Sequence, residues 1–143
     1  ANALAGYGLE RGARIATLAW NDYRHFETYY ASACSGYVCH TINPRLFPEQ
    51  LVFIINHAED RWVFTDVMFV PLLEKLAPQL PGVEGYVVMT DAAHMPQSTL
   101  PNLLCYETLL EAELFGIESI RCRLRRWRAR SRCTTTSSRS FAS

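Results

Sequence analysis

Short apolar runs alternate with longer segments of helical periodicity along most of the chain. Four runs rich in β-branched, aromatic and aliphatic residues predict buried strands at 14–20, 37–42, 61–66 and 84–91. Apolar residues that recur every three or four positions predict helices at 21–36, 48–58, 67–80 and 103–114. Strands that are apolar on both faces and alternate with helices are typical of a parallel sheet with helices on both sides. The pattern therefore predicts an α/β fold in three layers.

Several residues mark where these helices begin and end. Asn21 or Asp22 can cap the helix that follows the first strand, and Pro48 suits the first position of the next helix. Pro78 is expected to end the helix that starts near residue 67. Large aromatic side chains are expected in the core, namely Trp20, Tyr29, Tyr30, Phe64 and Phe69. Cys34 and Cys39 are likewise expected to be small core residues.

Composition limits the class of protein. A chain of 143 residues with 49% hydrophobic content is long enough to bury one core and is too apolar to be disordered. The longest apolar run, at 67–73, is too short to span a membrane, and residues 1–12 do not have the pattern of a signal peptide. The five cysteines form no C-x-x-C pair, which favours reduced thiols and a cytoplasmic location.

Charge divides the chain near residue 120. Residues 1–120 hold all 14 acidic residues and six of the 14 basic ones, whereas residues 121–143 hold eight arginines and no acid. An arginine- and serine-rich segment that includes Trp127 has three interpretations, which the composition does not separate. It is a site for nucleic acid or another polyanion, a disordered tail, or sequence that is not native to the gene.

The search for catalytic and metal-binding patterns leaves few candidates. His40 and His57 are 17 residues apart, which matches no ligand spacing, and we interpret them as a strand residue and a helix-end residue. The chain has no dinucleotide-binding fingerprint, nucleophile elbow or P-loop. His94 follows the fourth predicted strand, and ligands of parallel sheets collect at the carboxyl ends of strands. His94 is therefore the best-placed polar candidate, although an exposed loop histidine without a function remains the alternative.

Residues 14–64, together with 83–96 and 100–113, resemble the adenylate-forming superfamily, and within it the medium- and long-chain fatty-acid–CoA ligases. LAWN, with Trp20 and Asn21, matches the first strand of that family. The block GYVCHTINPRLFPEQLVFIINHAED matches the family's glycine followed by Asn-Pro-Arg-Leu and a helix. Its signature residues in this chain are Gly36, Asn43, Pro44 and Arg45.

The resemblance implies an enzyme that uses ATP and magnesium to convert a fatty acid to an acyl-adenylate and then transfers the acyl group to coenzyme A. It places residues 1–114 within part of the large N-terminal domain, starting after its beginning, and it leaves residues 115–143 as a divergent tail, disordered or non-native. It assigns no catalytic residue to this chain. His94 is the nearest candidate for a surface on the coenzyme A side, and the family signature residues are expected to be structural.

The family's phosphate-binding loop is expected soon after residue 120, but SRCTTTSSRS does not match it. Without its backbone N–H groups and lysine, nothing holds the leaving pyrophosphate, so we expect the chain alone to be inactive.

We hypothesise that residues 115–143 derive from a shifted reading frame, a truncated gene or an assembly error. The alternatives are a non-enzymatic α/β module with a polyanion-binding tail and a flavodoxin-like domain. A partial sheet is also expected to self-associate through exposed apolar edges.

Overall fold

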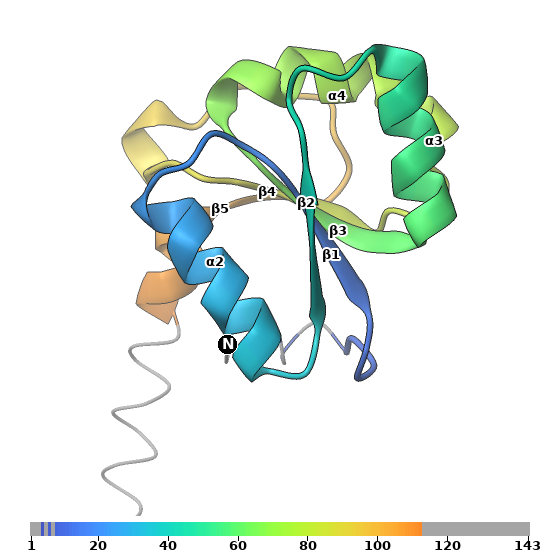
Figure 1. Cartoon of the computed structure of the whole chain (residues 1–143). Coiled ribbons are helices and arrows are strands. Elements are labelled where there is room, and N and C mark those ends of the chain that lie inside the picture. Colours follow the sequence, from blue (N-terminus) through green and yellow to red (C-terminus); the bar gives the residue numbers. More distant parts are fainter. Residues whose placement is uncertain (1–3, 5, 7, 113–143) are drawn as a thin grey trace, which may run out of the picture. The chain divides into compact units, whose positions relative to one another are not determined.

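Five parallel strands form one sheet in the order β2-β1-β3-β4-β5 (Figure 1). The structure, a computed structural model, describes residues 4, 6 and 8–112, and residues 1–110 make up one compact unit. The strands are β1 (Arg14–Leu18), β2 (Val38–Ile42), β3 (Asp60–Thr65), β4 (Gly85–Val88) and β5 (Leu103–Cys105). Because all of them are parallel, their carboxyl ends lie along the same edge of the sheet.

Helices cover both faces of this sheet (Figure 1). The helices are α2 (Tyr23–Cys34), α3 (Pro48–Ala58) and α4 (Val70–Leu76), with helical residues at 106–112 after β5. Single turns of 3₁₀ helix are η1 (Val67–Phe69), η2 (Ala77–Gln79) and η3 (Ala92–His94). Helices α3 and α4 lie on one face, while α2 and the helix after β5 lie on the other. The predicted three-layer α/β fold is confirmed, and no described helix is long and apolar enough to cross a membrane.

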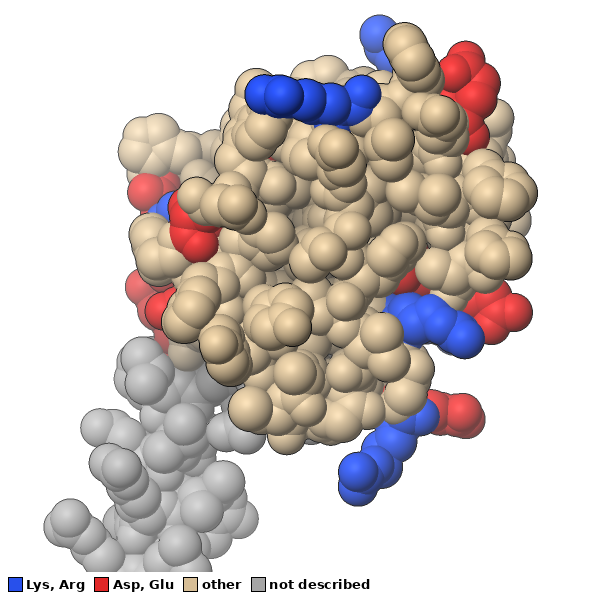
Figure 2. All heavy atoms as spheres, in the orientation of Figure 1, with Lys and Arg blue, Asp and Glu red and all other residues tan. Residues whose placement is uncertain are grey.

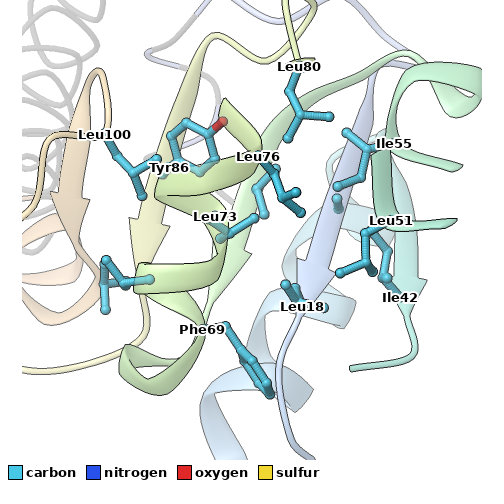
Figure 3. Packing of buried hydrophobic residues seen from close by; sticks show 14 residues of the cluster. Leu18, Ile42, Leu51, Ile55, Phe69, Leu73, Leu76, Leu80, Tyr86 and Leu100 are labelled. Carbon is cyan, nitrogen blue, oxygen red and sulfur yellow. The ribbon is translucent and has the colours of Figure 1, made fainter. Parts of the chain in front are cut away.

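Alternate residues of the strands supply two separate cores. In β1, Ala16 joins the core under α3 and α4, whereas Ile15 joins the core on the opposite face. In β3, Val63 likewise lies on the first face and Trp62 on the second. Figure 3 shows the first core, in which leucines and isoleucines of α3 and α4 converge on the sheet. This alternation explains why the strands are apolar on both faces.

Two predicted helices differ from the observed elements. The predicted helix at 103–114 begins with a strand, because Leu103, Leu104 and Cys105 pair with β4, and helical structure starts at Tyr106. Apolar residues at 103–105 suit either a strand or a helix. They form a strand because the edge of β4 offers unpaired backbone groups with which they can pair. The segment 67–80 is divided into η1, α4 and η2, with Pro71 in the first turn of α4 and Pro78 in η2.

The predicted burial of the aromatic residues is wrong for three of the five. Phe64 and Phe69 are buried, but Trp20, Tyr29 and Tyr30 are 44%, 46% and 52% exposed. Helix α2 instead buries the small polar residues Thr28 and Ser32, and the Ser32 hydroxyl donates to the Thr28 carbonyl oxygen at 2.8 Å. Small side chains let the helix lie close to the sheet, so the aromatic side chains point outward. Cys34, at the end of α2, is also exposed, contrary to expectation.

Predicted features of residues 113–143 lie outside the described part of the chain. These include the boundary at residue 114 and the arginine-rich tail, both of which remain predictions.

Candidate functional site

Three loops at the carboxyl ends of β1, β2 and β3 meet around Trp20. The indole Nε1–H of Trp20 donates to Met68 Sδ at 3.0 Å, and the guanidinium of Arg45 lies 5.9 Å from the Trp20 ring centroid. The backbone N–H of Trp20 donates to Asp66 Oδ2 at 2.8 Å, and burial raises the pKa of the Asp66 carboxyl. A cation, an indole and a carboxylate are thus held together at the edge where parallel sheets bind ligands.

The turn between β2 and α3 places Arg45 at this edge. Asn43 Oδ1 accepts a hydrogen bond from the Arg45 backbone N–H at 3.0 Å, and the Asn43 carbonyl oxygen accepts one from Leu46 at 3.2 Å. This is the local turn that asparagine favours. Within the described part of the chain, the exposed guanidinium of Arg45 makes no ion pair. It is therefore available to an anionic ligand.

A hollow of about 380 Å³ lies beside this cluster, lined by Asn21, Asp22, His25, Phe26, Tyr29 and Thr41. Asp22 caps α2 by accepting from the His25 backbone N–H at 2.8 Å. The ring Nε2 of His25 lies 2.9 Å from Thr17 Oγ1 on β1, which fixes the orientation of the imidazole. The lining combines two aromatic side chains with four polar ones, so an organic ligand there would meet both apolar and hydrogen-bonding groups.

The signature residues predicted from the sequence occupy different places in this arrangement. Trp20, Asn21, Asn43, Pro44 and Arg45 come together at the carboxyl edge, on the loops after β1 and β2. Gly36 lies elsewhere, just after α2, and takes a φ of 81°. Such a positive φ favours glycine, so this residue has a conformational role between α2 and β2.

His94 lies in η3, after β4, on the same edge of the sheet. Its Nδ1 lies 2.7 Å from Asp91 Oδ1, and its backbone N–H donates to the same oxygen at 2.9 Å. These contacts hold the pKa of the Asp91 carboxyl below its ordinary value. The His94 side chain is 76% exposed, so it is available to a ligand but is not part of an enclosed site. Its role on a coenzyme A side remains a prediction.

His40 and His57 have separate structural environments, in the strand and at the helix end that the sequence predicts. His40 Nδ1 lies 2.7 Å from Oδ2 of Asp60, while His57 stacks on Phe53 with 5.5 Å between ring centroids. Among the described residues, no three His, Cys, Asp or Glu side chains are grouped so that they could hold a metal ion.

Asp60 gives a testable pH dependence. Burial raises the pKa of its carboxyl above the ordinary value of 3.8, although the hydrogen bond with His40 and the charge of Arg14 lower it. A raised pKa in the folded state means that protonation of Asp60 favours folding, and this contribution is lost as the pH rises through the folded-state value. We expect the stability of the wild type, relative to Asp60→Asn, to fall as the pH rises from about 4.

Urea denaturation at several pH values measures this difference, whose slope is at most about 1.4 kcal/mol per pH unit. Asp91→Asn is the matched control, because the pKa of Asp91 is lowered: its stability difference rises with pH below about pH 4 and stays flat above it. The prediction would be contradicted if the free energy of unfolding of the wild type minus that of Asp60→Asn did not change between pH 4 and 8.

Sequence reasoning missed Asp66, Met68 and His25 as members of the cluster and hollow. Asp66 directly follows β3, so the rule that selected His94, a polar residue after a buried strand, also applies to it. No comparable signal marks Met68 or His25, because their positions depend on how the loops approach each other.

A second hollow, of about 430 Å³, lies at the other end of the strands, where Arg14–Glu59 and Arg61–Glu84 ion pairs neutralise the charges.

Comparisons with known proteins agree with this fold. The family model for AMP-binding enzymes matches residues 1–108. Over 110 residues, the chain is 50% identical to a 3-methylmercaptopropionyl-CoA ligase of Ruegeria lacuscaerulensis and 46% identical to a medium-chain-fatty-acid–CoA ligase of Ectopseudomonas oleovorans. Each match covers 77% of this chain but 20% of the relative. The chain therefore spans about a fifth of the length of these relatives.

A solved structure shows the same arrangement of elements. The crystal structure of an anthranilate CoA ligase in complex with anthranoyl-AMP superposes with a TM-score of 0.70 at 23% identity, covering 78% of this chain and 20% of that one. At this identity the likeness concerns the fold alone. Because the family model matches most of the chain, and the two relatives are similar over the same region, the chain belongs to the AMP-binding enzyme family.

Proposed function

We propose that this chain forms part of the large N-terminal domain of an acyl-CoA ligase. The complete enzyme would join a fatty acid to ATP as an acyl-adenylate and transfer the acyl group to coenzyme A. The family match over residues 1–108 carries this proposal. Similarity to fatty-acid–CoA ligases of Ectopseudomonas oleovorans (46% identity) and Thermus thermophilus (42% identity) supports a fatty acid as the substrate class.

The described residues do not fit magnesium triphosphate. A triphosphate needs several backbone N–H groups and cations around it, while magnesium is usually held by one or two carboxylates together with the phosphates themselves. The carboxyl edge instead provides the guanidinium of Arg45 beside Trp20, and the described part of the chain has no cluster of three carboxylate, histidine or cysteine side chains that could hold a metal. This arrangement fits one phosphate group of a ligand better than the reacting triphosphate.

We therefore propose that Arg45 binds an anionic group of coenzyme A. A guanidinium forms strong paired hydrogen bonds with phosphate oxygens, and the indole of Trp20 below it restricts its position. Trp20 is itself held in place by its contacts with Met68 and Asp66. His94 lies at the same edge and is a second candidate for this surface. The chain's own residues would thus hold coenzyme A in place, while other parts of the enzyme perform the chemistry.

The purified 143-residue chain is expected to form no acyl-CoA from fatty acid, ATP, magnesium and coenzyme A. The expected absence follows from the missing phosphate-binding loop, since nothing neutralises the leaving pyrophosphate. Thioester formation can be followed by mass spectrometry, with the Ectopseudomonas ligase as a positive control. ATP-dependent product that increases with chain concentration would refute this part of the proposal.

A chimeric enzyme tests the role of Arg45. Residues 1–110 of this chain would replace the matching segment of the Ectopseudomonas ligase, to which the chain is 46% identical. In this chimera, Arg45→Ala is expected to raise the KM for coenzyme A about tenfold or more, as the loss of a charge-assisted hydrogen bond costs roughly 1.5–3 kcal/mol. Acyl-adenylate formation, measured as pyrophosphate release without coenzyme A, should change little.

The matched control in the chimera is Arg14→Ala, because Arg14 lies at the opposite end of β1 and pairs with Glu59. Arg14→Ala should leave the KM for coenzyme A and the rate of acyl-adenylate formation close to those of the parent chimera. Equal loss of adenylate formation and thioester formation in Arg45→Ala would reject a role in coenzyme A binding. A correctly folded chimera that is inactive would instead count against the wider proposal that residues 1–110 serve in a ligase.

A further inference from the structure

Trp20 is held at three points although it lies at the surface. Its backbone N–H donates to Asp66 Oδ2 at 2.8 Å, and its indole Nε1–H donates to Met68 Sδ at 3.0 Å. Its ring centroid lies 5.9 Å from that of Phe69, with the two rings tilted by 45°. Trp20 is 44% exposed, so these contacts do not serve to bury it. Together they fix the orientation of the indole.

All three contacts come from one short segment, residues 66–69, which includes the single turn η1. The Asp66 backbone N–H donates to the Leu18 carbonyl oxygen at 3.4 Å, next to the paired strands β1 and β3. The Phe69 backbone N–H donates to the Asp66 carbonyl oxygen at 3.0 Å, and the Phe69 side chain is buried in the first core (Figure 3). The segment is thus anchored at both ends, so it supports Trp20 from a fixed position.

Met68 contributes an acceptor to this segment rather than packing. It is 63% exposed and belongs to neither core. Its thioether sulfur is a weak hydrogen-bond acceptor, and the indole N–H is a donor only. The last side-chain torsion of tryptophan has two broad orientations, and an acceptor on one side selects between them. Met68 therefore determines which way the Trp20 ring faces.

The direction of the ring matters because Arg45 lies over it. Figure 2 shows lysine and arginine side chains at the top of the molecule, where Figure 1 places the loop between β2 and α3 that carries Arg45. The exposed Arg45 guanidinium lies 5.9 Å from the Trp20 ring centroid. An arginine side chain loses rotamer freedom when it binds a ligand, so a ring that already restricts it lowers this cost.

We propose that Met68 is a positioning residue for the binding of coenzyme A by Arg45. The sulfur of Met68 fixes the Trp20 indole, and the indole holds the guanidinium where it can form paired hydrogen bonds with a phosphate group. Met68 acts through Trp20 and does not touch the ligand. The inference rests on the proposed role of Arg45. It adds that the loop after β3 controls the affinity of a site whose charge comes from the loop after β2.

The indole N–H of Trp20 gives a direct test in the full chain. The three tryptophans give separate indole signals in a proton–nitrogen NMR spectrum, and Trp20→Phe identifies the signal of Trp20. In the wild type, this proton should show a nuclear Overhauser contact with the Met68 methyl group. Met68→Leu keeps a similar volume but removes the acceptor, so the signal should shift and exchange faster with water. Met68→Gln supplies an amide oxygen and should restore slower exchange.

The same variants test binding in the chimeric enzyme. Met68→Leu is expected to raise the KM for coenzyme A roughly two- to tenfold, because one more side chain must be ordered on binding. Met68→Gln should recover most of this loss, and pyrophosphate release without coenzyme A should change little in either variant. Met95→Leu, the same substitution in the loop before β5, is the matched control and should change neither the Trp20 signal nor the KM.

Several results would overturn the inference. These are a missing contact between the Trp20 indole proton and the Met68 methyl group in the wild type, a Trp20 signal or a KM that is unchanged in Met68→Leu, a KM that Met68→Gln fails to restore, and an equal loss of adenylate formation. If Arg45→Ala itself leaves the KM unchanged, the proposed role of Arg45 fails and the inference fails with it. A raised KM in Arg45→Ala with an unchanged KM in Met68→Leu rejects the inference alone.

Discussion

Gly85→Ala is expected to lower the free energy of unfolding by about 2–3 kcal/mol, because extra atoms in a packed core force neighbouring groups to move. Gly85 is buried at the start of β4, opposite Trp62 of β3 in the sheet register. A Cβ at this position would lie 2.6 Å from two ring carbons of Trp62, well inside van der Waals contact. The indole is itself buried, so it cannot move away freely. The urea midpoint reports the loss.

Gly82→Ala is the matched control, since a Cβ at position 82 meets nothing within 4 Å. Its stability should stay the same or rise by a few tenths of a kcal/mol, because alanine restricts the unfolded chain. Combining Gly85→Ala with Trp62→Leu removes the ring and should cost less than the sum of the two single changes. If Gly85→Ala and Gly82→Ala had the same effect, the role assigned to Gly85 would be wrong.

Leu73→Ala is expected to destabilise the chain by about 2–5 kcal/mol, the usual cost of truncating a fully buried leucine. Leu73 lies on α4 with no exposed surface, and it packs in the core between the sheet and the helices α3 and α4 (Figure 3). Removing its side chain leaves a cavity that the rigid sheet cannot close. A loss of this size is a large part of the total stability of a typical domain.

The neighbouring Leu72 provides the control for this change, because it is the same residue on the same helix but only partly buried. Leu72→Ala should cost less than half as much as Leu73→Ala when both are measured by urea denaturation. Equal losses would mean that the truncation acts through helix stability rather than through the core. The pair therefore separates packing from helix propensity.

The alternation of strands and helices could be predicted from local sequence because it depends on patterns within each segment. The parallel sheet followed from strands that are apolar on both faces, such as the one that carries Val63 and Phe64. The strand at 103–105 was not predicted. Its three residues suit a helix as well as a strand, and their pairing with β4 involves residues almost twenty positions away. Local patterns contain no information about such pairing.

The candidate site was predicted only in part, for the same reason. The family signature named Trp20, Asn43 and Arg45 as structural residues and not as a site, and it did not show that the Arg45 guanidinium lies over the Trp20 ring. Asp66 and Met68 join them through a loop that lies more than forty residues after Trp20 in the chain. These contacts arise because parallel strands bring their following loops to one edge, and the strand order decides which loops become neighbours.

By itself, the sequence determined most of the element types, the parallel α/β class and the family, because hydrophobic periodicity and the Asn-Pro-Arg block are local properties. Only the tertiary structure decided which side of each element is buried. Helix α2 shows this most clearly, since its aromatic stripe faces outward and Thr28 and Ser32 face the sheet. Periodicity identifies an apolar face but not its partner. The choice depends on close packing, and here small side chains allow the helix nearer to the sheet than rings would.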